Sequence, residues 1–340
     1  MRVTNKMLSN SFLNDMRTNL ANMRTLQQQM TSGKEIRKPS DDPFKAARAM
    51  QLHSDINTNK QYNENIKDTL NWLDTTDTAL GQATDTMQRV RELLVSAGNA
   101  SYGSNERKAI KDEINQKVGE LSQILNTNFD GKYLFGGSRG TSKPVTTEID
   151  AATKNTKLVY SAKDGGKLQV SNPPVPTDAG YNEYNMIGAK LSVEISQGVT
   201  MEYNVSANDV LQFNENGTDY NLSEMLAKIT NHLDGKNDDG TAVDASATSK
   251  LTNEDLKGVT DAINNLLRVR SEVGSKQNRM ESAKEKNEEE NFNLTEILSK
   301  IEDIDITEKT MEYSTMQTVY MASLQTSAKV LQPSLIDYLR

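Results

Sequence analysis

The spacing of proline and glycine is the feature that most restricts how this chain can fold. All seven prolines fall outside 44–143 and 177–332, and twelve of the nineteen glycines lie between residues 131 and 240. Proline breaks the interior of a helix, whereas glycine favours turns. The distribution therefore predicts long helices in both flanks and a turn-rich middle.

In the two flanks, apolar residues recur every three or four positions, which is the period of one face of a helix. The pattern predicts helices over 13–30, from 44 to about 97, from about 104 to 128, over 251–304 and from about 308 to the chain end, separated by breaks at 31–43, 98–104 and 305–307. Both chain ends therefore belong to one helical structure. We expect an elongated, mainly α fold, a helical bundle or coiled coil formed by both termini, with a β-rich inserted domain.

In the middle of the chain, apolar residues recur at every second position instead of every 3.6 residues. This alternation predicts a hairpin of 191–195 with 199–205 and a second hairpin of 158–160 with 168–170. A short amphipathic helix over 222–233 and a loop over 235–250 follow. We expect three parts, namely terminal helices over 1–40 and 306–340, a long-helix domain over 41–135 and 250–305, and a β-rich insertion over 136–249.

Composition excludes several classes of function. The chain has no cysteine, so disulfides, thiolate metal sites and a cysteine nucleophile are ruled out. A net charge of −8 argues against nucleic-acid binding, which needs a basic face. No apolar stretch approaches the roughly 18 residues of a membrane span, and the N-terminus lacks the pattern of a cleaved signal peptide.

The residues that could carry catalysis have simpler interpretations. His53 and His232 lie far apart without a patterned partner, so each is expected to be solvated or to cap a helix. Asp41-Asp42 stands where a helix cap is needed, and Asp238-Asp239 lies in a turn that fails the EF-hand spacing. Phosphate-binding, zinc-protease and serine-hydrolase motifs are absent from the sequence. We expect no enzyme activity, no metal and no cofactor.

The two terminal stripes differ from the other apolar seams. Each belongs to a helix outside the break that bounds the long helices, and one helix pair buries little apolar surface to offset its ordering cost. We therefore expect these helices to pack against neighbouring subunits. The predicted assembly interface consists of Leu13, Met16, Leu20, Met23, Leu26 and Met30 near the N-terminus and of Met316, Tyr320, Leu324, Leu331, Leu335 and Leu339 near the C-terminus.

Three segments resemble a known family. Ser32–Pro43 reads Ser-Gly-Lys-Glu-Ile-Arg-Lys-Pro-Ser-Asp-Asp-Pro, 133–137 reads Tyr-Leu-Phe-Gly-Gly, and the chain closes on Leu-Ile-Asp-Tyr-Leu-Arg. Together with the nested layout, they resemble the flagellin superfamily of axial flagellar proteins. Flagellins usually carry alanine where this chain has Pro43. The form Pro39-Ser40-Asp41-Asp42-Pro43 is more like the hook-associated protein 3 group (FlgL), which joins hook and filament.

The resemblance implies an extracellular structural protein of the bacterial flagellum, acting in motility. Its terminal helices would form the coiled coil that lines the inner tube of a helical assembly, with the long helices and the β insertion outside. It would join the hook, through the first hook-associated protein, to the flagellin filament, in a ring of copies of itself. Export would use the flagellar type III channel, without a cleaved signal and with a cytoplasmic chaperone.

Three other functions compete with this interpretation. The nearest is flagellin itself, the bulk filament subunit. An exported enzyme with its active site in the β insertion would need a catalytic constellation that the sequence does not offer. A cytoplasmic coiled-coil tether would share the helical seams but would stay inside the cell.

Overall fold

The computed structural model describes residues 5–98, 103–151, 153–171, 174–215 and 217–330. The chain divides into two compact units, Met1–Lys60 with Glu288–Arg340, and Gln61–Asn287. The division falls within two long helices, α2 (Pro43–Ala97) and α8 (Leu256–Glu302). The first unit joins the two flanks of the sequence, and the second contains the middle.

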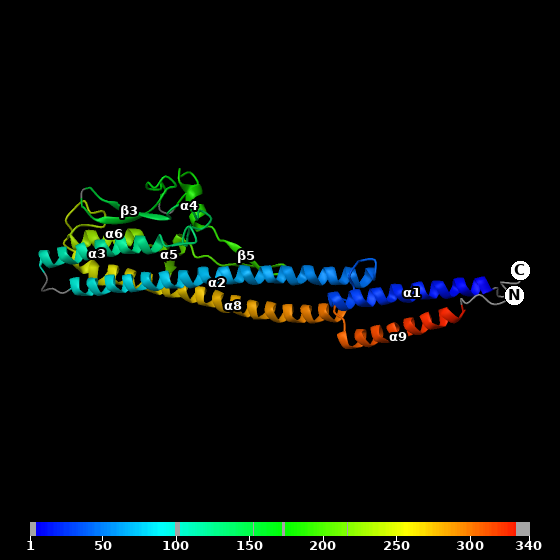
Figure 1. The fold of residues 1–340 in the computed structure, drawn as a ribbon. Helices are drawn as coiled ribbons and strands as arrows, with labels where there is room; N and C mark the ends of the chain where they lie inside the picture. The colour runs from blue at the N-terminus through cyan, green and yellow to red at the C-terminus, as the bar shows by residue number, and fades with distance from the viewer. Residues whose placement is uncertain (1–4, 99–102, 152, 172–173, 216, 331–340) are drawn as a thin grey trace, which may run out of the picture. The chain divides into compact units, whose positions relative to one another are not determined.

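The first unit is helical in its described part. It contains α1 (Asn5–Ser32), the start of α2, the end of α8 and α9 (Ile306–Val330). Helices α1 and α9 lie side by side and run in opposite directions, α1 in blue and α9 in red (Figure 1). The predicted break between the last two helices is confirmed, because α8 ends at Glu302 and α9 begins at Ile306.

In the second unit, α2 and α8 each carry a buried residue at every seventh position. The side chains at these positions are almost fully buried, Ile66, Leu73, Leu80, Met87 and Leu94 on α2 and Val259, Leu266, Val273 and Met280 on α8. A seven-residue apolar repeat keeps one seam of a helix facing its partner, as in coiled coils. Across the pair, Arg270 donates to both carboxylate oxygens of Asp77 at 2.7 and 3.0 Å. The helical seams predicted from the sequence are confirmed.

The remaining elements of the second unit are short. They are α3 (Ser104–Leu125), the strands β1 (Asn128–Phe129), β2 (Lys132–Tyr133), β3 (Val145–Ile149), β4 (Thr156–Tyr160), β5 (Ser192–Ser196), β6 (Val199–Glu202), β7 (Gln212–Glu215) and β8 (Thr218–Asn221), and the helices α4 (Tyr181–Gly188), α5 (Ala207–Leu211), α6 (Leu222–Leu233) and α7 (Ala247–Lys250). A π-helical turn, η1 (Leu251–Asp255), leads into α8. The strands form antiparallel pairs in chain order. The hairpin β3–β4 packs on α3, and β4 also packs on α6.

Two predictions for the middle are confirmed, one is wrong, and one holds in part, since the predicted loop over 235–250 ends in the helix α7. The hairpin β5–β6 and the helix α6 lie where the sequence placed them. The predicted pairing of 158–160 with 168–170 is reduced to one bridge between Ser161 and Lys167, and the strand that pairs with β4 over five residues is β3. The segment after Lys167 cannot extend the ladder, since the amide of Val170 bonds back to the carbonyl of Leu168.

The two units differ in how much core they have. The second unit holds a continuous cluster of buried side chains from its helices and hairpins. Among the described residues of the first unit, the cluster consists of Ala49, Leu52, Ile56 and Leu298, with Leu294 and Ile301 packed against it. None of the described side chains of α1 and α9 belongs to that cluster.

Candidate assembly interface

Along the predicted apolar stripe of α1, some side chains are covered by the rest of the unit and others are exposed. Leu26 is buried, and Met16, Met23 and Met30 are half-buried. Leu13 and Leu20, by contrast, are 42% and 50% exposed. These two leucines lie seven residues apart and therefore share one side of the helix. The described part of the chain leaves that side open.

Helix α9 has apolar residues on more than one face. Its predicted residues Met316 and Tyr320 are half-buried, whereas Leu324 is 45% exposed. Sequence reasoning missed four further exposed apolar side chains on this helix, those of Ile306, Met311, Val319 and Met321. A helix that is apolar around much of its circumference is normally buried on several sides. Leu331, Leu335 and Leu339 lie outside the described residues.

A groove of about 740 Å³ lies between α1 and α9. Leu26, Met311 and Met316 supply its apolar lining, and Glu308 and Glu312 stand at the side contributed by α9. As far as the described residues go, the pair of helices is therefore incompletely packed.

The loop after α1 ties the two flanks of the first unit together. Gly33, with φ +72°, ends α1 in the left-handed conformation that glycine adopts most readily. The Glu35 amide donates to the carbonyl of Glu302 at 2.6 Å, and the Ile304 amide donates to that of Gly33 at 3.1 Å. These backbone bonds hold the end of α1 against the end of α8, and thus fix where α9 begins.

The signature Pro39-Ser40-Asp41-Asp42-Pro43 shapes the entry into α2. Asp42 Oδ1 accepts hydrogen bonds from the amides of Phe44 and Lys45, both at 3.0 Å, and Pro43 is the first residue of the helix. Asp41 Oδ2 accepts from the Lys38 amide at 3.0 Å and so closes the preceding turn. The capping role expected for this acidic pair is therefore confirmed for Asp42 alone.

The two histidines occupy unlike places. His53 is exposed, with Nε2 3.2 Å from Glu302. The expectation of a solvated or capping residue is wrong for His232, which is buried between Asp255 and Asp238. The acid Asp238 likewise does more than shape its own turn. Sequence spacing could not show this, because the packing of α6 against η1 creates the cluster.

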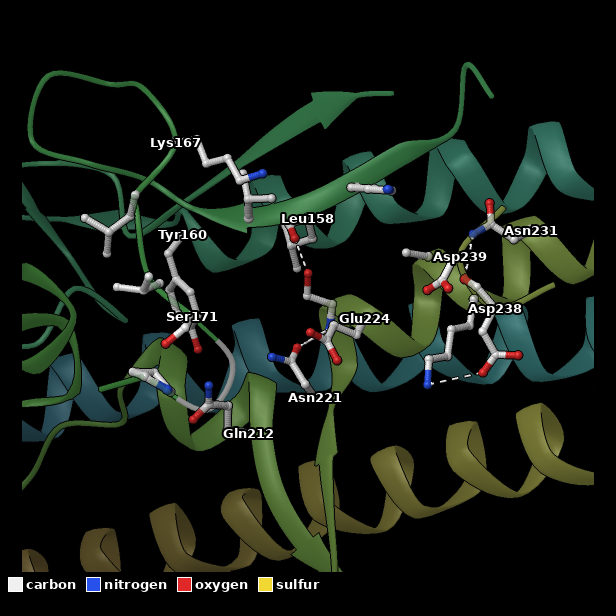
Figure 2. Close-up of a pocket in the computed structure, with 18 residues that line it drawn as sticks. Leu158, Tyr160, Lys167, Ser171, Gln212, Asn221, Glu224, Asn231, Asp238 and Asp239 are labelled. Atoms are coloured by element: carbon white, nitrogen blue, oxygen red, sulfur yellow. Dashed lines mark hydrogen bonds and ion pairs between the residues drawn. The ribbon is translucent and has the colours of Figure 1, made fainter. Parts of the chain in front are cut away.

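The β insertion contains a polar cavity of about 610 Å³ between β4 and α6. Figure 2 shows Tyr160, Ser171 and Gln212 at one end and Asn231, Asp238 and Asp239 at the other. The Ser223 hydroxyl donates to the carbonyl of Leu158, which ties α6 to β4. Within the described ranges, no three histidine or acidic side chains come together as a metal site would require.

None of the helices in the described residues has both the length and the apolar character that a membrane span requires.

Comparison with known proteins matches both flanks. The family model of the bacterial flagellin N-terminal helical region covers residues 3–139, and that of the C-terminal helical region covers 256–339. A flagellin of Clostridium tyrobutyricum is 25% identical over 92% of this chain and 94% of its own length. Flagellar hook-associated protein 3 of Escherichia coli is 24% identical over 95% of each chain.

The solved structures agree with this assignment at the level of fold. The crystal structure of flagellar hook-associated protein 3 from Legionella pneumophila superposes with a TM-score of 0.57 at 14% identity, covering 74% of this chain and 98% of that one. Helical termini around a strand-containing middle are thus a known arrangement. The chain belongs to the bacterial flagellin superfamily, resembles hook-associated protein 3 within it, and is a structural protein of the flagellum, not an enzyme.

Proposed function

We propose that this chain is the junction subunit between the flagellar hook and filament. The main support comes from the first unit, in which helices α1 and α9 expose apolar side chains and enclose an incompletely filled groove. A subunit made to be covered by others on several sides explains both features. Two observations favour the junction role over other flagellar roles. The chain is similar to flagellar hook-associated protein 3 of Escherichia coli, and its signature has Pro43 at the position where flagellins usually carry alanine.

In this proposal the terminal helices form the inner tube and complete their burial against copies of the same chain in a ring. The first hook-associated protein and flagellin would be the neighbours on the two sides, after export with a chaperone through the flagellar channel. Full burial of a leucine contributes roughly 1.5–3 kcal/mol before ordering costs. Leu13, Leu20 and Leu324 are already about half buried in the subunit, so covering the rest would supply roughly 2–4 kcal/mol for each subunit.

Deleting the gene tests the role. We expect basal bodies with hooks but without filaments, and flagellin released into the medium. Normal filaments in the deletion strain would exclude the junction function.

Complementation of that strain tests the interface. The Leu20→Asp variant should fail to restore filaments, because it places a charge on the exposed apolar side of α1. Ala21→Asp is the matched control, since it adds the same charge about 100° around the helix. The purified Leu20→Asp protein should unfold at the same denaturant concentration as the unaltered chain, since Leu20 is half-exposed in the subunit. Full filaments built by Leu20→Asp would show that the interface is misassigned.

A second candidate is flagellin itself, favoured by the relative from Clostridium tyrobutyricum that matches almost the full length. Gold-labelled antibody against this chain distinguishes the two on intact flagella. Label confined to the boundary between hook and filament supports the junction subunit, whereas label along the whole filament supports flagellin.

A further inference from the structure

The last turn of α6 holds a buried histidine between two carboxylates. The His232 side chain is 2% exposed, with Nδ1 2.6 Å from Asp255 Oδ2 and Nε2 3.1 Å from Asp238 Oδ1. An ionised carboxylate only accepts hydrogen bonds, and a neutral imidazole carries a single N–H. Both contacts are therefore hydrogen bonds only when the ring is a doubly protonated imidazolium.

The ring joins three parts of the second unit. Asp255 is buried on η1, whereas Asp238 lies on the loop after α6 and is partly exposed. Lys250 of α7 pairs with Asp238 at 2.9 Å and with Asp244 at 3.1 Å. The other charged groups around the cluster are Lys228 of α6, 3.4 Å from Asp238, and the pair of Asp234 with Lys111 of α3 at 2.9 Å.

The charges around the ring set the direction of its titration. Burial lowers the pKa of His232, but the hydrogen bonds and charges of Asp255 and Asp238 outweigh burial and raise the pKa above its ordinary 6.5. A raised pKa in the folded state means that the charged clamp is fully present below pH 6.5. The clamp is lost as the pH rises through the folded value.

We propose that His232 is a pH-sensitive pin that helps hold the loop 234–246 against α6 and loosens its hold as the pH rises. The shorter bond to the buried Asp255 keeps the remaining proton on Nδ1, so the proton that leaves to solvent comes from Nε2. The lone pair of Nε2 then faces the carboxylate of Asp238, which is repulsive. Asp238 is 42% exposed and turns toward water, where it keeps its lysine partners.

Loosening of the loop affects the cavity of the β insertion. Asp238 and Asp239 line one end of that cavity, beside Asn231 (Figure 2). The loop has internal bonds that do not involve the ring, such as the Asn237 amide to the carbonyl of Ala242 at 2.8 Å and the Asp244 amide to that of Gly235 at 2.9 Å. Without the ring contact, these bonds and the one from the Asn231 side-chain amide to the Asp238 carbonyl, at 2.9 Å, hold the loop alone, so they open more often.

Histidine NMR of the full-length chain tests the protonation. The chain has only two histidines, and a His53→Gln variant assigns both signals. We expect the His232 midpoint to lie above that of the same chain unfolded in urea. Asp238→Asn should lower the midpoint, and Asp239→Asn, the neighbouring acid, should leave it unchanged. A His232 midpoint at or below the unfolded value would overturn the proposal.

Amide hydrogen exchange of residues 237–244 tests whether the loop loosens as the pH rises. After correction for the intrinsic effect of pH on exchange, opening of the loop should increase about tenfold for each pH unit by which the folded midpoint exceeds the unfolded one. The His232→Gln variant should show the open level of exchange at every pH, while exchange in α2 stays unchanged. Protection of the loop that is constant across the His232 midpoint would show that the ring is not its pin.

Discussion

Lys34 Nζ lies 2.7 Å from Asp303 Oδ1, although the two residues stand near opposite ends of the sequence. The contact joins the loop after α1 to the end of α8, and Ser299 also donates to Asp303, at 2.6 Å. Hydrogen bonds and the charge of Lys34 lower the pKa of Asp303, and the Asp303 carboxylate in turn raises the pKa of Lys34. The pair is a chemical link between the two flanks that form the first unit.

We expect this link to contribute little to stability, because both side chains are about 40% exposed. A double-mutant cycle of Lys34→Ala and Asp303→Asn should give a coupling energy of about 0.2–1 kcal/mol. The coupling should fall as salt is raised from 0.05 to about 0.5 M, since exposed charges are screened. Chemical denaturation measures it. A coupling well above this range, or one insensitive to salt, would mean that the pair is shielded from solvent.

The cap at Asp42 is a second local prediction. Asp42→Ala removes the acceptor for the amides of Phe44 and Lys45, so it should lower the free energy of unfolding by about 1 kcal/mol. It should also speed amide exchange at these two positions. Ser40→Ala, in the same loop, is the control and should change neither quantity. Equal effects of the two substitutions would argue against the cap.

Much of the helical fold could be predicted because its signals are local. The seven-residue seam from Ile66 to Leu94 is visible as a period, and Asp42-Pro43 as a helix start. The hairpin β7–β8 was missed although Asn-Gly at 216–217 is a strong turn signal. Its flanking residues are mostly polar, and the stacked rings of Phe213 and Tyr220 are its main apolar pair.

The remaining features depend on packing between distant segments. The pairing of His232 with Asp255 arises only once α6 and η1 meet. For the assembly interface, the stripes of α1 and α9 were visible, but the sequence could not show which edge this chain covers itself. That depends on the crossing of the two helices.

Acid should weaken the second unit through Asp209. Burial raises the pKa of Asp209, but Lys190 and the hydrogen bonds from Ser206 outweigh it and hold the pKa below the ordinary 3.8. A lowered pKa in the folded state gives stability that is present above pH 3.8 and lost as the pH falls through the folded value.

Unfolding measured from pH 6 down to pH 2 tests this expectation. Asp209→Asn should cost about 1 kcal/mol at neutral pH, through the capping box with Ser206, and should flatten the acid dependence. Asp112→Asn, exposed on α3, should leave the slope as it is. An unchanged slope in Asp209→Asn would show that other carboxylates govern the acid transition.

Gly137 should tolerate no side chain. It has φ +57°, and a Cβ there would lie closer than 3.0 Å to the carbonyl oxygens of Met186 and Ile187 at the end of α4. The neighbouring Ser138 amide donates to Met186 at 2.9 Å, so the two segments cannot separate without losing that bond. Gly137→Ala therefore has to displace backbone, and we expect a loss of more than about 3 kcal/mol in unfolding free energy.

Gly131 provides the matched control for this position. It also has positive φ, +75°, but nothing within 4 Å of the Cβ position. Gly131→Ala should therefore cost only the conformational strain, about 1 kcal/mol. Chemical denaturation of both variants compares crowding with strain. Similar losses for the two would mean that strain alone accounts for Gly137, and that the contact with α4 yields to a methyl group.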